Sequence, residues 1–532
     1  MRGPPAELLL PGIPPGEQLI TRRRFLRFGR GFAALAAAGA LPAWRSVRRV
    51  RFQESPFTLG VASGDPTASG AVLWTRLDPA ELAFADAASR EVAVRWEVSA
   101  DDAFRQIVRT GESRALPELG HSVHAEVEGL EPGRWYWYRF DAGGIESPAG
   151  RLRTAPAPGE VPASLRFAFA SCQHYEHGYY TAYRHMAAEE PELIIHLGDY
   201  IYEMRYGEII RDAAPDELMT LADYRNRYAL YRSDPDLQAA HAACPWIVTW
   251  DDHEVDNNYA GAVPEDAQGR HEFLMRRAAA YQAYYEFMPL RRSSMPTGPA
   301  MQLFRRLDFG DLASFHVLDT RQYRSDQACG DGRAPRCWPA FTPDRTLLGA
   351  AQEAWLHDGL ASGPARWNFL AQQVRMAEVA IPPREGESEE SFSLDMWDGY
   401  PAERERLLGF LAREEVPNPV VLTGDIHSHW AADLKRDFGD PGSATVGVEL
   451  VGSSISTGGD GADAQRFTAE ILAANPHVRL FSGLRGYVSV TVGPEGCRSD
   501  FRTVPYVSRP GAPVETRASF AVEDVRAGLE EA

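Results

Sequence analysis

Four short apolar runs, rich in β-branched and aromatic residues, predict buried strands that each end in polar side chains. The runs cover residues 165–171, 193–197, 245–250 and 420–423. They lead directly into Cys172, Gly198-Asp199, Asp251-Asp252-His253 and Gly424-Asp425-Ile426-His427. Because open α/β sheets gather their function at the carboxyl ends of strands, we expect these endings to form one site.

Segments with helical periodicity alternate with these runs and predict a layered α/β domain over residues 163–507, with central β-sheets flanked by helices. The expected helices are 179–190, 222–244, 272–287, 350–360 and 401–416. Residues 508–532 are expected to form a tail or a short helix.

Residues 57–155 alternate with period two and carry no long helical pattern, which predicts a small all-β immunoglobulin-like sandwich ahead of the α/β domain. The alternating runs are 71–76, 91–98, 122–127 and 135–140. A Pro/Ala/Gly-rich linker at 156–162 separates the two parts.

The first 50 residues resemble a twin-arginine export signal. Residues 21–27 read Thr-Arg-Arg-Arg-Phe-Leu-Arg, and the small apolar run at 31–43 is too short to span a bilayer stably. The resemblance predicts recognition by the twin-arginine translocation machinery and a periplasmic or secreted location. It also implies that the protein is exported already folded. The alternative is a disordered basic tail.

Composition narrows the class of protein. The chain has 532 residues and a formal net charge of −19, which disfavours a generic nucleic-acid or anionic-membrane binder. A phosphate substrate still fits an acidic protein if bound metals reverse the local field. Lys435 is the only lysine, so a lysine nucleophile or a P-loop is not expected. We expect a monomer with no stable membrane span.

The five cysteines fall into different settings. Cys329 and Cys337 bracket a short polar loop, which predicts a local disulfide in an oxidising compartment. Cys244 and Cys497 are interpreted as structural. Cys172 follows a predicted strand and is a candidate thiolate ligand.

Asp199 and Tyr202 are three residues apart, so both can turn toward one centre as the chain leaves its strand. A carboxylate can bridge two cations, and a phenolate suits a hard trivalent ion such as Fe³⁺. The alternative is that each Asp caps a helix and each His fills the core. Four such endings together favour a metal site.

The order Ser171-Cys172, Gly198 to Glu203, Asp251 to Glu254 and Gly424 to His427 resembles the PhoD-type alkaline phosphatases, distant relatives of calcineurin-like and purple acid phosphatases. The resemblance covers essentially the whole chain. It implies Fe³⁺ held by Cys172, Asp199, Tyr202 and His427, with Asp199 also bridging to a second ion, commonly Ca²⁺, bound by Asp252 and Asp425.

The motifs depart from those of typical metallophosphoesterases, which open with Asp-x-His and close with Gly-His-x-His. Carboxylates in place of imidazole and amide harden the second site and favour Ca²⁺ over Zn²⁺. No further strand-end His is evident. Asn257, Asn258 or the pair Gln372-Gln373 could supply a remaining ligand.

The sequence therefore predicts a secreted phosphatase that hydrolyses phosphate monoesters, diesters or both with a metal-activated hydroxide. His253 is the candidate to protonate or stabilise the leaving oxygen, and the alternative is that it is a metal ligand or a purely structural imidazole. Arg485 is a candidate to hold a phosphate oxygen. His429 is expected to point away. The alternatives are a phospholipase D-like phosphodiesterase of the same family and a cell-surface binding module, which has no use for these ligands.

Overall fold

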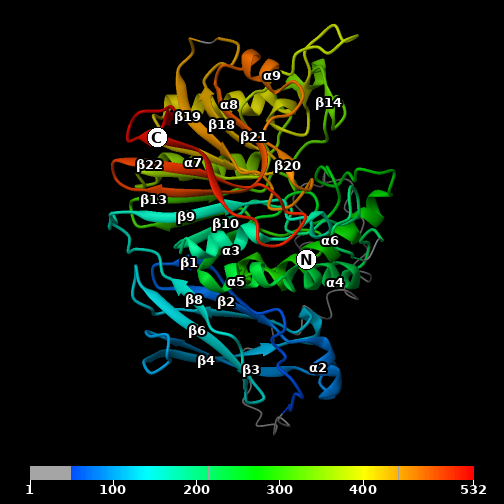
Figure 1. The fold of residues 1–532 in the computed structure, drawn as a ribbon, viewed down its shortest axis with the longest axis vertical. Helices are drawn as coiled ribbons and strands as arrows, with labels where there is room; N and C mark the ends of the chain where they lie inside the picture. Colours follow the sequence, from blue (N-terminus) through cyan, green and yellow to red (C-terminus); the bar gives the residue numbers. More distant parts are fainter. Residues whose placement is uncertain (1–49, 214–215, 441) are drawn as a thin grey trace, which may run out of the picture.

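The computed structural model describes residues 50–213, 216–440 and 442–532. A strand-rich N-terminal region lies at one end of the molecule, and a larger part of mixed strands and helices is stacked on it (Figure 1). The predicted export signal in residues 1–49 lies outside the described residues. In the part of the chain that is described, no helix is both long and apolar enough to cross a bilayer.

The N-terminal region consists of two layers of strands around one core. Alternating burial along β6 turns Tyr136, Tyr138 and Phe140 inward, as period-two patterning predicts. These rings pack with Leu73 and Val123 of the facing layer. One layer contains β3 (Val92–Ser99), β4 (Ile107–Ala115), β6 (Trp135–Ala142), β7 (Ile145–Glu146) and β8 (Gly150–Arg153), and the other β1 (Val61–Thr67), β2 (Gly70–Arg76) and β5 (Ser122–Val127).

The second of these layers continues into the main sheet. Ser63 and Gly64 of β1 pair in parallel with Pro245 and Trp246 of β11 (Pro245–Val248). Pairing covers an edge of β11 that would otherwise expose unsatisfied backbone groups. The all-β region is therefore joined to the rest by backbone hydrogen bonds as well as by the linker, which the sequence pattern did not predict.

The main sheet has two halves that share one long strand, β21 (Val478–Val492). Its residues 478–482 pair with β18, and its residues 488–492 pair with β9. The first half contains β9 (Leu165–Ala170), β10 (Leu193–His196), β11, β22 (Gly496–Val504), β23 (Glu515–Glu523) and β24 (Glu530–Glu531); the second contains β12 (Arg305–Phe309), β13 (Ala313–Val317), β15 (Trp367–Ala371), β17 (Pro419–Thr423), β18 (His429–Lys435) and β19 (Thr445–Val451).

The two halves pack on each other through an aromatic core. The ring of Phe167 meets Phe315 and Phe369 edge to face, with centroids 5.2 and 5.1 Å apart. Helices cover the outer faces. The helices α3 (Thr181–Ala188), α4 (Leu221–Arg232), α5 (Pro235–Ala243) and α6 (Arg270–Phe287) pack on the first half, and α7 (Ala350–Ser362) and α8 (Pro401–Arg413) on the second.

Smaller elements complete the described chain. The disulfide between Cys329 and Cys337 is present, as predicted. Three cysteines, Cys172, Cys244 and Cys497, are free and buried. The remaining strands and α-helices of the described chain are α2 (Pro79–Phe84), β14 (Arg333–Ala334), β16 (Phe392–Ser393), β20 (Gly461–Ala462) and α9 (Thr468–Ala474). Short 3-10 helices lie at η1 (Pro117–Leu119), η2 (Tyr175–His177), η3 (Arg292–Ser294), η4 (Trp338–Phe341) and η5 (Trp397–Gly399).

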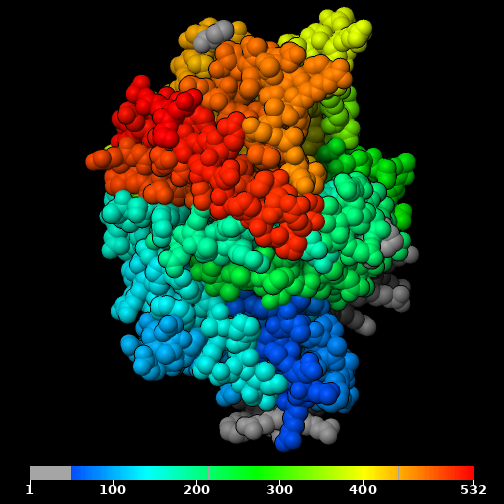
Figure 2. Space-filling model, viewed as in Figure 1, coloured from blue at the N-terminus to red at the C-terminus, as the bar shows by residue number. Residues whose placement is uncertain are grey.

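Two expected elements differ in the structure. The expected helix at 222–244 is broken into α4 and α5, because Asp234 accepts hydrogen bonds from the amides of Asp236 and Leu237 and Pro235 begins a new helix. The expected tail or helix after Val507 is instead β23, which pairs along β22. This C-terminal segment lies on the surface of the main part in Figure 2.

Candidate metal centre

The four predicted strand endings come together in space. β9, β10 and β11 are parallel neighbours, so their carboxyl ends share an edge. β17 belongs to the other half of the sheet, and a parallel bridge between Ser171 and Ser454 links the two halves beside it. Cys172, Asp199, Asp425 and His427 all have left-handed backbone conformations, with φ of 57°, 56°, 64° and 53°. Such strained conformations cluster at functional sites.

Two glycines allow this convergence. A Cβ on Gly198 would lie 2.6 Å from the backbone nitrogen of Asp251, and Gly198 has φ of 109°. A Cβ on Gly424 would lie 2.5 Å from Ser171 Oγ. The first contact sets β10 against β11, and the second sets β17 against β9. Glycine is therefore required where the ligand-bearing loops touch.

We expect Gly198→Ala to destabilise the protein by about 2 kcal/mol or more, since the clash is with backbone and φ is strained. The displaced loops should also lower the metal content of the purified protein. Chemical denaturation and elemental analysis measure the two effects. Gly332→Ala is the control, because a Cβ there meets nothing within 4 Å. Equal behaviour of the two variants would contradict the close-contact explanation.

One group of candidate ligands contains Asp199 and lies on the side of Asp199 that faces the end of β9. Ligand atoms of Cys172, Asp199 and His427 all lie within 4.8 Å of one another. The hydroxyl of Tyr202 donates to Asp199 Oδ2 at 2.9 Å and lies 3.3 Å from His427 Nε2. A thiol, a carboxylate, a phenol and an imidazole thus lie together, with the imidazole of His427 half-buried and the other three groups buried.

A second group lies on the other side of the same carboxylate. Oxygen atoms of Asp199, Asp251, Asp252 and Asp425 lie within 4.8 Å of one another. All four are carboxylates, which suits a hard, oxygen-preferring cation. Asp199 therefore belongs to both groups. Asp251 was not singled out from the sequence, although it immediately precedes Asp252.

The chemistry of the cluster fits bound cations. Asp199 Oδ1 is buried and accepts no hydrogen bond, which is costly for a carboxylate oxygen. Burial raises the pKa of Asp199, Asp425 and the Cys172 thiol well above their ordinary values, and neighbouring carboxylates raise each of them further. Cations placed between these groups would stabilise their ionised forms.

Arg321 is a buried cation at the cluster that sequence reasoning missed. Its Nε donates to Asp251 Oδ1 at 2.5 Å, and its Nη2 lies 3.6 Å from Asp252 and 3.7 Å from Asp425. A further buried carboxylate, Asp395, lies 2.8 Å from Nη1. Arg321 follows Leu318 by three residues, beyond the end of β13, and no nearby motif marked it.

The side chains of Glu254 and Thr457 connect the ligand-bearing loops through hydrogen bonds. Glu254 accepts from the amides of Asp199 and Asp251 at 3.1 and 2.8 Å, so one carboxylate ties two loops together. Thr457 Oγ1 lies 2.9 Å from the Tyr202 hydroxyl and 2.7 Å from the carbonyl oxygen of Cys172. Glu254 was visible in the Asp-Asp-His-Glu run, whereas nothing in the sequence pointed to Thr457.

His253 lies at the cluster, where a ring nitrogen is within 4.8 Å of oxygen atoms of Asp199 and Asp252, and it is held by another acid. Its Nδ1 is 2.7 Å from Glu203 Oε2, and its ring packs on that of Tyr202 with centroids 4.2 Å apart. Burial lowers the pKa of His253, but Glu203 and Asp252 outweigh it and raise the pKa well above its ordinary value. Glu203 belongs to neither ligand group.

Arg485 has a different environment from the one predicted. Its Nε donates to the carbonyl oxygen of Gly459 at 2.8 Å, and its Nη1 donates to that of His427. Nη1 also lies 3.2 Å from Ser454 Oγ. With its donors directed at protein oxygens, Arg485 is placed to fix the loop that carries His427. A phosphate contact for Arg485 is not supported by this geometry.

The side chains that were considered for the remaining metal ligand form hydrogen bonds with other residues. The side-chain amides of Gln372 and Gln373 donate to the hydroxyl oxygens of Thr423 and Thr249. The backbone N–H of Asn258 donates to Asp252 Oδ2 at 2.7 Å, so Asn258 supports a candidate ligand, while its side-chain amide donates to Asp331. Asn257 bonds to Glu265 through its side chain. His429 is buried away from the cluster, where its Nδ1 accepts from the Ser453 amide, as expected.

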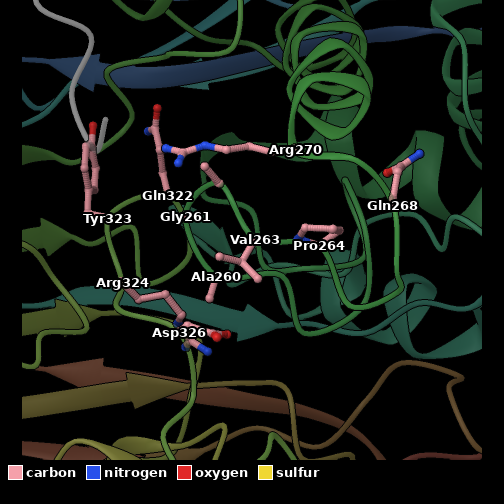
Figure 3. A pocket seen from close by; sticks show the side chains of 11 residues that line it. Ala260, Gly261, Val263, Pro264, Gln268, Arg270, Gln322, Tyr323, Arg324 and Asp326 are labelled. Carbon is pink, nitrogen blue, oxygen red and sulfur yellow. The ribbon is translucent and has the colours of Figure 1, made fainter. Parts of the chain in front are cut away.

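A separate pocket of about 330 Å³ lies beside the loop that follows β11 (Figure 3). It is lined by residues 260–264 and 322–324 together with Gln268, Arg270 and Asp326. Arg324 on its wall donates to Asp395 and to the carbonyl oxygen of Thr320. None of the candidate metal ligands lines this pocket, so it is not the centre of the chemistry.

The converging strand ends and the adjoining imidazole form a cluster of potential metal ligands of the kind that metal-dependent phosphoric ester hydrolases use. The chain belongs to the PhoD-like phosphatase family, whose profile matches residues 167–501, and the profile of the family's N-terminal domain matches residues 42–156. The family and the enzyme class predicted from the sequence are therefore confirmed.

Two known proteins are similar to this chain over nearly its whole length. Alkaline phosphatase D of Bacillus subtilis (strain 168) is 50% identical over 518 residues, which is 96% of this chain and 88% of that protein. A solved structure of PhoD is 52% identical with a TM-score of 0.87, covering 90% of this chain and 93% of that one. Similarity of this extent supports a phosphatase function.

Proposed function

We propose that this phosphatase hydrolyses phosphate monoesters, diesters or both at the carboxylate cluster, with two kinds of metal ion held there. The observation that carries the proposal is the position of Asp199, which belongs to both ligand groups and keeps one buried oxygen without a hydrogen-bond partner. A carboxylate so placed suits two cations at once.

The donor sets favour different ions. Cys172, Tyr202, His427 and Asp199 would hold Fe³⁺, because thiolate and phenolate supply anionic charge to a trivalent ion. Asp199, Asp252 and Asp425, joined by Asp251, would hold a divalent ion, and an all-carboxylate set favours Ca²⁺. When bound, such ions polarise phosphoryl oxygens and lower the pKa of water.

Residues of the protein itself would protonate the leaving group and hold the ligand-bearing loops in position. His253 is 8% exposed, so its ring reaches the solvent side of the cluster while Glu203 fixes its orientation. The imidazolium favoured by Glu203 is suited to give a proton to the leaving oxygen. Arg485, Glu254 and Thr457 hold the ligand-bearing loops in place.

The fold and the export sequence are consistent with this proposed phosphatase. The two face-to-face halves of the sheet, with helices outside, are consistent with a metallophosphoesterase-like layering, and the two layers of residues 57–155 with an immunoglobulin-like sandwich. The twin-arginine sequence at 22–23 supports export to the periplasm or beyond. A phospholipase D-like diesterase is the alternative within the family.

Tyr202→Phe tests the iron assignment. We expect visible absorbance to disappear, and iron content and turnover to fall together, because only the phenol oxygen is lost. The ring packing on His174 and His253 remains, but the buried hydrogen bonds of the hydroxyl with Asp199 and Thr457 are lost, so the metal-free protein should lose about 1–3 kcal/mol of stability and still fold. Absorption spectroscopy and elemental analysis provide the readouts.

Tyr228→Phe is the matched control, since the buried Tyr228 hydroxyl has no hydrogen-bond partner and lies outside both ligand groups. It should keep colour, iron and activity. If the Tyr202 variant also kept its iron and its colour, Tyr202 would be a packing residue and the Fe³⁺ assignment would lose its support.

A further inference from the structure

Asn258 connects the carboxylate side of the metal cluster to a loop that the Cys329–Cys337 disulfide closes. The backbone N–H of Asn258 donates to Asp252 Oδ2 at 2.7 Å. Together with the backbone N–H of His253, which donates to Oδ1 at 3.0 Å, it orients the Asp252 carboxylate. Partners of this kind determine how a ligating carboxylate meets its ion.

Asn258 needs support from its surroundings to keep this N–H in place. Its φ of 50° lies in the left-handed region, which residues with a side chain seldom adopt, although asparagine tolerates it better than most. The residue is also half-buried, close to the surface. Because a strained conformation persists only where neighbouring groups hold it, the contacts of Asn258 decide whether its N–H stays on the carboxylate.

Two side chains hold Asn258, and they lie two residues on either side of Cys329. Gln327 Nε2 donates to the Asn258 carbonyl oxygen at 2.9 Å, and Asp331 Oδ2 accepts from the Asn258 side-chain amide at 3.3 Å. Gln327 Nε2 also donates to Asp395 Oδ1 at 2.6 Å, so it ties Asn258 to a second buried carboxylate at the cluster. The support of Asn258 therefore comes from the segment around one half of the disulfide.

The disulfide joins this segment to an anchored end. Beside Cys337, Arg336 lies 2.8 Å from Glu378, and its guanidinium carbon lies 3.7 Å from the centroid of the Phe392 ring. Every residue between the two cysteines is exposed or half-buried, so burial contributes little to fixing the ring. The covalent bond therefore restricts the positions that are open to Asp331.

We propose that Asp331 is a positioning residue for the divalent ion, because it holds Asn258 in the conformation that orients the Asp252 carboxylate. The disulfide keeps Asp331 in place. The inference rests on the proposed function, since it needs an ion at the carboxylate group. Within the described residues, no hydrogen bond or ion pair joins residues 327–337 to the ligand group that contains Cys172, so iron binding should not depend on the loop.

Calorimetry of Ca²⁺ binding to the purified protein, after treatment with a calcium-selective chelator, tests the role of Asp331. Asp331→Ala should bind Ca²⁺ about tenfold more weakly than the wild type, as is usual when the outer support of a metal ligand is lost. Asp331→Asn should restore most of the affinity, because its side-chain oxygen can still accept from Asn258. Iron content and visible absorbance should stay unchanged in both variants.

Asp344→Ala is the matched control for the loss of a carboxylate. Asp344 is exposed, and its side chain forms no hydrogen bond or ion pair with the part of the chain that the structure describes. This variant should bind Ca²⁺ as the wild type does.

The contribution of the disulfide is tested by its removal. The double variant Cys329→Ser with Cys337→Ser should weaken Ca²⁺ binding as Asp331→Ala does. A dithiol reductant should have the same effect on the wild type: its two thiols are oxidised to a disulfide, while Cys329 and Cys337 each gain one electron and one proton and become thiols. The reductant should not change Ca²⁺ binding by the double variant.

The outcomes distinguish the inference from the proposed function. A selective loss in Asp331→Ala that Asp331→Asn restores supports the positioning role. Equal affinity in the wild type and Asp331→Ala, or equal losses in both Asp331 variants, overturn that role and leave the divalent site standing. Unchanged affinity in the double cysteine variant overturns the part assigned to the disulfide. If the wild type binds no Ca²⁺, or Asp252→Asn binds it equally well, the proposed divalent site fails and the inference fails with it.

Discussion

Asp199→Asn is expected to lower kcat/KM for phosphate esters by on the order of a thousandfold or more, while the protein still folds. Asp199 is the residue shared by both ligand groups, so its charge is needed on both sides. Burial, together with Asp252 and Asp251, raises the pKa of this carboxyl in the absence of cations. A neutral amide of the same shape should therefore cost the metal-free protein little.

The response to chelation gives a second readout. Ligands that bind only the folded state stabilise it, so removal of metal should lower the unfolding temperature of the wild type. The Asp199→Asn variant should respond much less, because it has little metal to lose. Asp463→Asn, which removes an exposed carboxylate paired with Arg517, is the control and should match the wild type in both assays. Turnover above a few per cent in Asp199→Asn would contradict the shared role.

Arg321→Met is expected to destabilise the metal-free protein by about 3–5 kcal/mol, the usual cost of removing one partner from a buried ion pair. The fully buried guanidinium contacts Asp251 and Asp395 directly and lies near Asp252 and Asp425. Without it, carboxylates are left close together with no internal cation. Denaturant unfolding of the metal-free protein measures the loss.

Metal should offset part of this loss, because cations can take over the neutralising role. Arg321→Lys keeps the charge but not the planar fork, so it should recover only part of the stability. Arg517→Met removes an exposed pair with Asp463 and should cost about 1 kcal/mol or less. A loss in Arg321→Met no larger than in this control would show that Arg321 does not hold the cluster together.

The strand endings could be predicted because their signal is local. Each apolar run stops at a ligand-type residue, and parallel pairing of β9, β10 and β11 brings the endings together. The break at Pro235 was also readable in principle, since Asp-Pro marks the start of a helix. The prediction of one continuous helix over residues 222–244 was based on the helical period alone and therefore missed the break.

What could not be predicted depends on contacts between distant segments. Arg321 reaches the cluster only because the two halves of the sheet pack face to face, and Thr457 only because the chain returns beside Ser171. The strand β23 joins the sheet by pairing with β22, although most of its residues are exposed or half-buried and its apolar residues alternate only weakly. Arg485 was assigned to substrate for its charge, but its neighbours are carbonyl oxygens.

Anomalous X-ray diffraction from crystals of the purified protein, recorded on both sides of the iron absorption edge, tests the central claim most directly. We expect an iron peak among Cys172, Asp199, Tyr202 and His427, and a second, non-iron cation on the far side of Asp199 among Asp251, Asp252 and Asp425. A protein that carries iron and a divalent metal in solution but shows no peak beside Asp199, or shows both peaks elsewhere, would contradict it.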